Sequence, residues 1–408
     1  MRDVYVVGVA RTDFKRNLRK EGKALADVIV EAGRGALADA GVAAADVGAG
    51  IVGNFAAGLF AGQLHLGALL LDIDPALVGI PTAHVEAACA SGGLAVATAA
   101  RGIAAGLHDV VLVVGAEQQK TMAPADGAEV LATAADKAAE RPAYGDHMMP
   151  RMFASIADRY AARHGLADRT LALVAAKNHA HAALNPLAQT RGGGMSLERA
   201  LAADDSNPRF APPLKVSDCS QISDGAAALV LAAAPLAGRP AIRLRGLGQA
   251  TDRLRLADKE VPEFPVARRA AEQAFRMAGI GPREIDCAEV HDCFSITEIV
   301  TYELLGWAEP GGATRLVETG ATMLPQVHRE LVGTAAPPWS LPVNTGGGLI
   351  GDGHPVGATG VRQVAEIFDQ LVGRAGARQV EGARRALSFN LGGTFTTSVA
   401  MVWERAGK

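Results

Sequence analysis

The stretch that decides the fold is His84–Gly93, which reads HVEAACASGG and holds Cys89 in a turn of small residues. It leads into the Ala-rich stretch Leu94–Leu107, whose composition favours a helix. A cysteine near a helix N-terminus feels the positive end of the macrodipole and unpaired backbone N–H groups, both of which favour the thiolate. Cys89 is therefore a candidate nucleophile. The alternative is a small buried cysteine that packs the start of a helix.

The composition is that of a large globular protein. The chain of 408 residues predicts about two or three domains. With 49% hydrophobic and 20% charged residues, it can bury large cores and is not of the disordered type. The net charge is −3 and we find no Lys/Arg block suited to a nucleic-acid groove, so we expect no nucleic-acid partner. An anionic ligand would therefore have to be bound by a few cationic or N–H groups at its own site, because the protein as a whole carries no net positive charge.

The sequence shows no membrane or export signal. Arg101 and Pro235 interrupt the most apolar stretches before they reach the roughly 18 residues that a span requires. The strand-like Val4–Val9 leaves no room for a cleavable leader, and Gly407-Lys408 is not a peroxisomal address. We therefore expect a cytoplasmic protein without membrane partners.

The cysteines and histidines do not form a metal-binding pattern. Four cysteines, at positions 89, 219, 287 and 293, lack the spacing of a disulfide framework and are expected to be thiols. Cys287 and Cys293 lie six positions apart without a second close pair to complete four zinc ligands. His179 and His181 would point to different faces of a helix, so we expect ordinary packing or surface roles.

The order of elements repeats once along the chain. The first half predicts strand 3–10, helix 24–40, strand 50–55, the Cys89 turn with its helix, and strand 108–115. The second half predicts strand 241–247, helix 265–278, strand 287–290, a Gly-rich turn at 344–360, helix 361–372 and strand 386–390. Such alternation predicts two α/β halves with mostly parallel, buried sheets.

Residues 120–209 lack that alternation and predict an inserted helical cap, since long excursions of this kind are usually lids or binding elements. The strand-like 226–233 then returns the chain to the first half. The predicted domains are 1–119 with 210–240, the cap 120–209, and 241–408. Cap residues that would line a pocket for a bulky or branched chain, or else pack a core, are Tyr144, His147, Met148, Met149 and Phe153.

Two further segments carry candidate chemistry. Six glycines between Gly346 and Gly357 allow close backbone approach, and Pro355 fixes the segment just after His354. The turn is equivalent by pseudo-symmetry to that of Cys89. The alternative is that the Gly-rich segment is only a structural turn with a surface histidine. It lacks the sequence motifs of phosphate-binding loops. The run HDCFS at 291–295 follows a predicted strand, where catalytic groups gather in α/β folds, so His291 and Cys293 are expected to face Cys89.

At these residues the chain resembles the thiolase superfamily, and specifically its sterol-carrier-protein-2-type branch. The matching segments, in family order, are CASGG at 89–93, DCSQISDGAAA at 218–228, HDCF at 291–294 and GHPVGATG at 353–360. The resemblance implies two pseudo-symmetric βαβαβαββ halves that form a layered αβαβα core, with an inserted loop domain. It also implies a homodimer or a dimer of dimers.

The resemblance further implies acyl exchange with coenzyme A (CoA) as co-substrate and no bound cofactor or metal. Cys89 would attack the ketone of a 3-oxoacyl-CoA, and the acyl group would stay on its sulfur as a thioester. CoA would then accept this acyl group. The reverse reaction is a Claisen condensation. His354 would be the general base. Many thiolases carry a second acid in a C-terminal Cys-x-Gly, but here that segment reads NLGG at 390–393. The branch supplies the acid from the HDCF run, which makes Cys293 the expected acid/base.

The remaining roles concern oxygen atoms and CoA. By resemblance, His291 and His354 would donate hydrogen bonds to the enolate oxygen. The N–H groups of Cys89 and Gly392 would donate to the oxyanion of the tetrahedral intermediate. Ser220 matches a serine that contacts CoA in the family, or else it caps the following strand.

Two other classes stay open. One is a non-catalytic CoA-ester-binding scaffold subunit, acting with a small zinc-containing partner protein of the oligonucleotide-binding fold. The other is a ketosynthase or retro-aldol lyase on the same fold. Cys293 disfavours the synthase, which needs no second thiol, and Cys89 disfavours an aldolase that has discarded the nucleophile.

Overall fold

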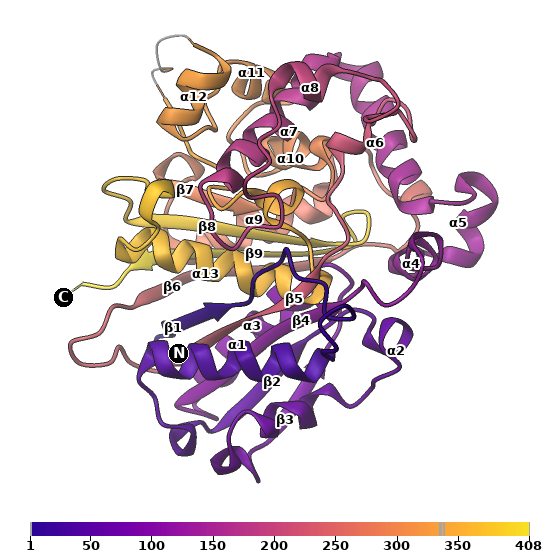
Figure 1. Ribbon diagram of the computed structural model, residues 1–408. Helices are drawn as coiled ribbons and strands as arrows, with labels where there is room; N and C mark the ends of the chain where they lie inside the picture. The colour runs from indigo at the N-terminus through magenta and orange to yellow at the C-terminus, as the bar shows by residue number, and fades with distance from the viewer. Residues whose placement is uncertain (1, 334–336, 338, 408) are drawn as a thin grey trace.

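The computed structural model describes residues 2–333, 337 and 339–407. Within them, nine strands form one sheet in the order β3-β2-β4-β5-β1-β6-β9-β8-β7 (Figure 1). The strands are β1 Tyr5–Arg11, β2 Ala49–Gly53, β3 Thr82–Val85, β4 Val110–Gln118, β5 Asp224–Ala232, β6 Ile242–Thr251, β7 Cys287–Val290, β8 Arg385–Gly392 and β9 Thr397–Arg405. The helices of the two halves are α1 Leu25–Ala40, α2 Ala57–Phe60, α3 Ser91–Ala104, α9 Pro265–Ala278, α10 Ser295–Leu304, α11 Ala313–Glu318, α12 Pro325–Leu331 and α13 Thr359–Val372.

The predicted duplication is confirmed by the strand order. From the edge to the centre of the sheet, the first half runs β3-β2-β4-β5-β1 and the second half runs β7-β8-β9-β6. In the place equivalent to β3, Val343 makes an isolated parallel bridge to Ala288 of β7. The halves join where β1 and β6 pair at Tyr5–Arg243 and Val6–Ile242. Each half therefore follows the predicted βαβαβαββ order.

The expectation of mostly parallel sheets is wrong. Among the described strands, three pairs are parallel (β2–β3, β2–β4 and β7–β8) and five are antiparallel. Only strands joined by a crossover are obliged to run parallel, and the last strand of each half is reached differently. A short turn after Gly392 connects β8 to β9, and β5 follows the long segment 120–209. Both strands run antiparallel to their neighbours.

The helices α3 and α13 form a central layer between the two halves of the sheet. Each contacts strands of both halves and the other helix. The outer layers are α1 on the first half and α9 on the second (Figure 1). A Cβ atom on Gly360 would lie 2.1 Å from the nitrogen of Gly93, so this crossing admits only glycine at its tightest point. The first turns of the two central helices thereby meet.

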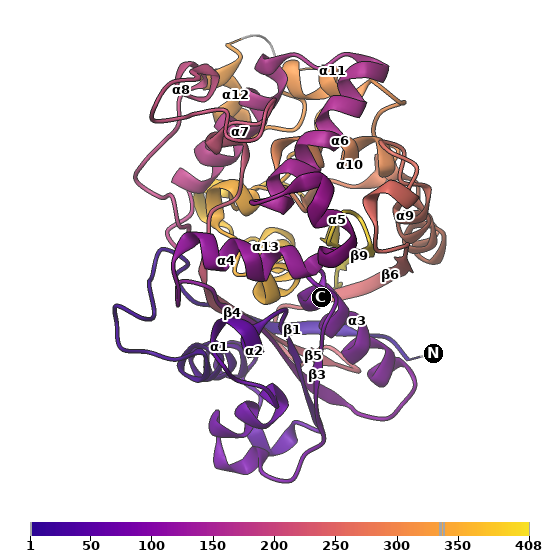
Figure 2. The ribbon, with the colours of Figure 1, turned by 90° about the vertical axis from the view of Figure 1, so that its right-hand side faces the viewer.

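The segment 120–209 is helical and extends over the second half. Its helices are α4 Pro124–Leu131, α5 Lys137–Tyr144, α6 Met148–His164, α7 Asp168–Ala183 and α8 Leu197–Leu201. In Figure 2, α4 and α5 lie in front of α13, toward the viewer. Among the described residues, no helix combines the length and apolarity needed to cross a bilayer. The division into three domains stays a prediction.

Candidate active site

The turn before α3 presents Cys89 at the N-terminal end of the helix. Ala88 adopts a left-handed conformation with φ of 50°, which turns the chain sharply just before the cysteine. The Ser91 hydroxyl accepts a hydrogen bond from the Ala87 N–H (2.9 Å) and donates one to the Ala88 carbonyl (2.6 Å). The helix begins at Ser91, three residues earlier than expected, so its start lies two positions after Cys89.

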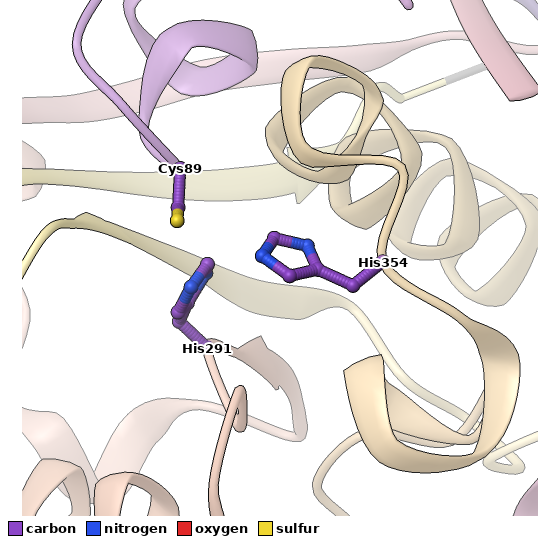
Figure 3. Close-up of side chains that lie close together, drawn as sticks. All are labelled: Cys89, His291 and His354. Carbon is purple, nitrogen blue, oxygen red and sulfur yellow. The ribbon is translucent and has the colours of Figure 1, made fainter. Parts of the chain in front are cut away.

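Three of the predicted side chains converge. The Cys89 sulfur and one ring nitrogen each of His291 and His354 all lie within 4.8 Å of one another. Figure 3 shows them approaching from three separate segments of the chain. The two imidazole rings meet edge to face, with centroids 5.2 Å apart and planes at 84°. The fold thus brings together three motifs that lie far apart in the sequence, with Cys89 about two hundred residues or more from both histidines.

Burial outweighs the helix-end effects that favour a Cys89 thiolate. Burial raises the pKa of the Cys89 thiol to about 12, although the N–H groups of Gly393 and of Cys89 itself oppose the shift. Burial also lowers the pKa of His354 to about 3, with Arg362 adding to the effect. Removing the anion from water outweighs the nearby backbone dipoles. The resting pair is therefore a thiol beside a neutral imidazole.

His354 is fixed at both its backbone and its ring. Its N–H donates to the Ser223 hydroxyl at 2.8 Å, and its Nδ1 lies 2.6 Å from the Thr359 hydroxyl. That hydroxyl donates in turn to the Pro355 carbonyl at 3.3 Å. When the hydroxyl donates its proton to that carbonyl, Nδ1 carries the ring proton and Nε2 keeps its lone pair. This tautomer suits a general base.

Asn390 fixes the tautomer of His291. The amide Oδ1 accepts from the Gly93 N–H at 3.0 Å, while Nδ2 donates to the Cys89 carbonyl at 3.1 Å. These two partners leave one orientation for the amide. Nδ2 is also 3.1 Å from His291 Nδ1, which must therefore accept. Because burial lowers the pKa of His291 well below its usual value, the ring is neutral and its Nε2 carries a proton for donation.

Sequence reasoning noted Asn390 only as the place of a missing cysteine. It also missed Asp292, whose carboxylate accepts the N–H groups of Leu349 (2.7 Å) and Ile350 (3.2 Å) in the Gly-rich turn. That carboxylate ties the HDCF segment to the turn that carries His354. An acidic residue between a histidine and a cysteine was the only signal available for it in the sequence.

Cys293 lies in the turn between β7 and α10 and lines the same cavity as Cys89 and His354. Its sulfur is 3.6 Å from the Thr297 hydroxyl. Burial raises its pKa, and the neighbouring Cys89 adds to the shift. Cys293 is thus a protonated thiol, the state that an acid requires.

The cavity beside Cys89 has a volume of about 250 Å³ and mostly apolar walls. Of the five cap residues singled out from the sequence, His147, Met149 and Phe153 line it. Phe153 stacks on Phe294 with ring centroids 4.5 Å apart. Tyr144 and Met148 are not among its described lining residues.

Two predicted contacts lie at the cavity wall. Ser220 lines the cavity, and its N–H donates to the Cys293 carbonyl at 2.9 Å. The N–H of Gly393, just after β8, lowers the pKa of the Cys89 thiol, and Gly393 lines the cavity. The role of the Gly392 N–H stays a prediction.

Known protein families and relatives match this chain along nearly its whole length. The model of the thiolase N-terminal domain matches residues 4–191, and that of the thiolase C-terminal domain-like family matches residues 248–405. An acetyl-CoA acetyltransferase from Methanothermobacter thermautotrophicus is 38% identical over 99% of this chain and 100% of its own length. Sterol carrier protein 2 from Gallus gallus is 33% identical over 96% of this chain and 70% of its own length.

Solved structures share the fold. A structure titled "Ltp2-ChsH2(DUF35) aldolase" has a TM-score of 0.79 at 22% identity and covers 99% of this chain and 98% of that one. A monomeric SCP2-thiolase-like protein from Mycobacterium smegmatis has a TM-score of 0.70 at 19% identity, over 99% of this chain and 77% of that one. With the family models and relatives above, the chain belongs to the thiolase family, in the sterol-carrier-protein-2-type branch that its motifs predict.

Proposed function

We propose that this protein is a thiolase that transfers acyl groups between Cys89 and CoA. It cleaves a 3-oxoacyl-CoA by thiolysis or, in reverse, joins two acyl groups by Claisen condensation. The observation that carries the proposal is the approach of Cys89, His291 and His354 to within 4.8 Å of one another. The lone pair on His354 and the proton on His291 supply the base and the donor that this chemistry needs.

The first step forms a bond between the Cys89 sulfur and the ketone carbon of the substrate. His354 Nε2 takes the thiol proton, and the carbonyl electron pair moves onto oxygen. The N–H groups of Cys89 and Gly392 stabilise that oxyanion, and Gly393, whose N–H lowers the pKa of the Cys89 thiol, is a third candidate donor. Proton transfer is coupled to attack, because the resting sulfur is protonated.

The second step breaks the carbon–carbon bond next to the ketone. Its electron pair becomes an enolate, whose oxygen accepts hydrogen bonds from His291 and His354, and Cys293 protonates the enolate carbon. An acyl-CoA leaves. The thiol of a new CoA then gives its proton back to Cys293 and attacks the acyl carbonyl, while Cys89 recovers its proton from His354 and departs.

Acyl transfer to Cys89 is tested by mass spectrometry under denaturing conditions. Brief incubation with acetyl-CoA or a 3-oxoacyl-CoA is expected to leave an acyl adduct on the Cys89 peptide, and none on Cys89→Ser. Cys219→Ala is a matched control, because Cys219 lines the same cavity without a proposed role. An unmodified Cys89 peptide in the wild type would refute the proposal. Repeating the reaction with a chelator tests the prediction that no metal is needed, since the Cys89, His291 and His354 spacing would also suit an ion.

The role of Cys293 is tested separately. Cys293→Ala is expected to acylate Cys89 from acetyl-CoA and to lose carbon–carbon cleavage, since the enolate then lacks its proton donor. Full thiolysis by this variant would contradict the assignment.

Two alternatives are separated by the same assays. A scaffold subunit would bind CoA esters without forming the adduct, and a retro-aldol lyase would cleave a 3-hydroxyacyl-CoA rather than a 3-oxoacyl-CoA. The similar structure titled as an aldolase also names a second protein, ChsH2. A zinc-containing partner subunit and a homodimer therefore remain proposals for this chain, to be tested by co-purification and by the mass of the purified protein in solution.

A further inference from the structure

The cluster of Cys89, His291 and His354 has the composition and spacing of a metal site. One ligand atom of each residue lies within 4.8 Å of the other two, and Figure 3 shows the three side chains together. Zinc is commonly held by thiolate and imidazole ligands, and three protein ligands with one open position are typical of catalytic zinc. The adjoining cavity, which Cys89 and His354 line, would provide that position. A divalent ion bound here would occupy the thiol that acyl transfer requires.

The nitrogens left for an ion are the two Nε2 atoms. Nδ1 of His354 lies 2.6 Å from the Thr359 hydroxyl, and Nδ1 of His291 lies 3.1 Å from Nδ2 of Asn390. Both Nδ1 atoms are therefore engaged by neighbours outside the cluster. An imidazole nitrogen binds a metal only through a free lone pair. His354 has one on Nε2 when its Nδ1–H group donates to Thr359.

His291 lacks such a lone pair because of Asn390. Nδ1 of the neutral ring accepts a hydrogen bond from the Asn390 amide, so the single ring proton sits on Nε2, the atom that would have to bind the ion. Moving that proton to Nδ1 would set an N–H group against the N–H group of the amide. His291 therefore presents a proton to the cluster, where a metal ion would need an electron pair.

Rotating the Asn390 amide does not relieve this conflict. Its Oδ1 accepts from the Gly93 N–H at 3.0 Å, and its Nδ2 also donates to the Cys89 carbonyl at 3.1 Å. An exchanged amide would face N–H with N–H at Gly93 and oxygen with oxygen at Cys89. Asn390 is fully buried, where polar groups without partners are costly. The two backbone contacts thus fix the tautomer of His291.

We propose that the Asn390 amide keeps divalent metal ions out of this cluster by holding the proton of His291 on Nε2. Cys89 and His354 then remain as two ligands, one fewer than the cluster would otherwise offer. A carboxylate in place of the amide would act in the opposite way, because metal-binding histidines commonly donate their second N–H to a carboxylate. Partners of this kind change metal affinity by about 10–100-fold. The inference concerns the binding of an ion and does not depend on the reaction that the site catalyses.

The test is a double-mutant cycle at Asn390 and His291 with Co²⁺ as the probe, since Co²⁺ binds the same kinds of ligand as Zn²⁺ and absorbs light. When Co²⁺ binds Cys89, the thiol proton passes to the buffer and a thiolate-to-cobalt absorption band appears. We expect Asn390→Asp to bind Co²⁺ about 10–100-fold more tightly than the wild type. His291→Gln alone should bind as the wild type does. In the double variant, Asn390→Asp with His291→Gln, the gain should vanish.

The cycle separates the tautomer from the added charge. If the new carboxylate attracted the ion by charge alone, the gain would survive His291→Gln, and that result would overturn the inference. Equal Co²⁺ affinities of the wild type and Asn390→Asp would overturn it as well. Ser220→Asp, which adds a carboxylate to the wall of the adjoining cavity, is the charge-matched control and should bind Co²⁺ nearly as the wild type does. A gain as large as that of Asn390→Asp would count against the tautomer.

A measurement on the wild type keeps the inference testable if a variant does not fold. Nuclear magnetic resonance of protein with isotopically labelled histidine nitrogens distinguishes protonated from unprotonated ring nitrogens, and loss of signals in His291→Gln assigns them. We expect a proton on Nε2 of His291 and none on Nδ1. A proton on Nδ1 would overturn the inference. Neither readout requires acyl transfer, so both decide the inference even if Cys89 is never acylated and the proposed function fails.

Discussion

Asn390 links the nucleophile to its histidine partner through one amide. Asn390→Asp replaces the Nδ2 donor with an oxygen that faces the Cys89 carbonyl and favours a proton on His291 Nδ1, which removes the Nε2 proton. Losing one oxyanion donor typically lowers kcat by about 10²–10³. We expect such a fall in kcat for thiolysis with little change in KM. Steady-state kinetics of Asn390→Asp checks this, and Asn390→Cys, which restores the Cys-x-Gly pattern, serves as the comparison. A kcat within a few-fold of wild type would contradict the role.

The resting protonation of Cys89 gives a pH prediction. The raised pKa of the thiol, about 12, keeps the thiolate scarce at all ordinary pH values, and the pKa of His354, about 3, keeps the imidazole neutral over the same range. Alkylation of Cys89 by iodoacetamide should therefore rise about tenfold per pH unit between roughly pH 6 and 9, because only the thiolate reacts. Mass-spectrometric rates on the Cys89 peptide measure this. A plateau near neutral pH would instead indicate a thiolate–imidazolium pair.

The sequence predicted the side chains that converge at this scale, because Cys89, His291 and His354 sit in short motifs at strand ends and turns. It could not predict their protonation. That depends on burial and on partners such as Thr359 and Asn390, which a motif does not specify.

At the scale of elements, the crossing of α3 and α13 is held by glycine. In Gly360→Ala the new Cβ would lie 2.1 Å from the Gly93 nitrogen, so the first turns must separate. Overpacking of this kind typically costs about 1–3 kcal/mol. We expect the free energy of unfolding to fall by that much and Cys89 acylation to slow. Gly102→Ala, in the same α3 with its nearest neighbour at 3.7 Å, is the control and should be neutral or stabilising, since alanine favours helix. Equal stabilities of the two variants in denaturant would contradict the tight crossing.

Periodicity and glycine stops predicted α1 and α9 within a residue at their C-terminal ends, where Gly41 and Gly279 adopt left-handed conformations. Strand directions were harder. The alternation of strands and helices shows the order of the elements but not the direction of each strand in the sheet. The directions of β5 and β9 depend on their pairing partners, which for β5 lie far along the chain and for β9 lie across a short turn.

At the scale of the whole molecule, the central layer makes the halves interdependent. Its core combines residues of both, among them Val96 and Ile103 of α3 with Val361 and Phe368 of α13. All three tryptophans lie after residue 240, so their fluorescence reports on the second half. Hydrogen exchange in β4 reports on the first. We expect the two probes to give the same denaturant midpoint, because neither half buries its central helix alone. Separate midpoints would show that the halves unfold independently.

The reactive side chains and the walls of the cavity belong to different packing units. Cys89 and His354 lie in the turns that lead into α3 and α13, whose crossing is too tight for a methyl group, whereas Leu131 and Met149 come from α4 and α6. Variation accumulates where packing tolerates it, so natural diversification should leave the crossing unchanged and concentrate in the helices above it. Preferences for new acyl groups can then arise through substitutions of a few residues in the cavity wall, while the catalytic cysteine and its histidines stay the same.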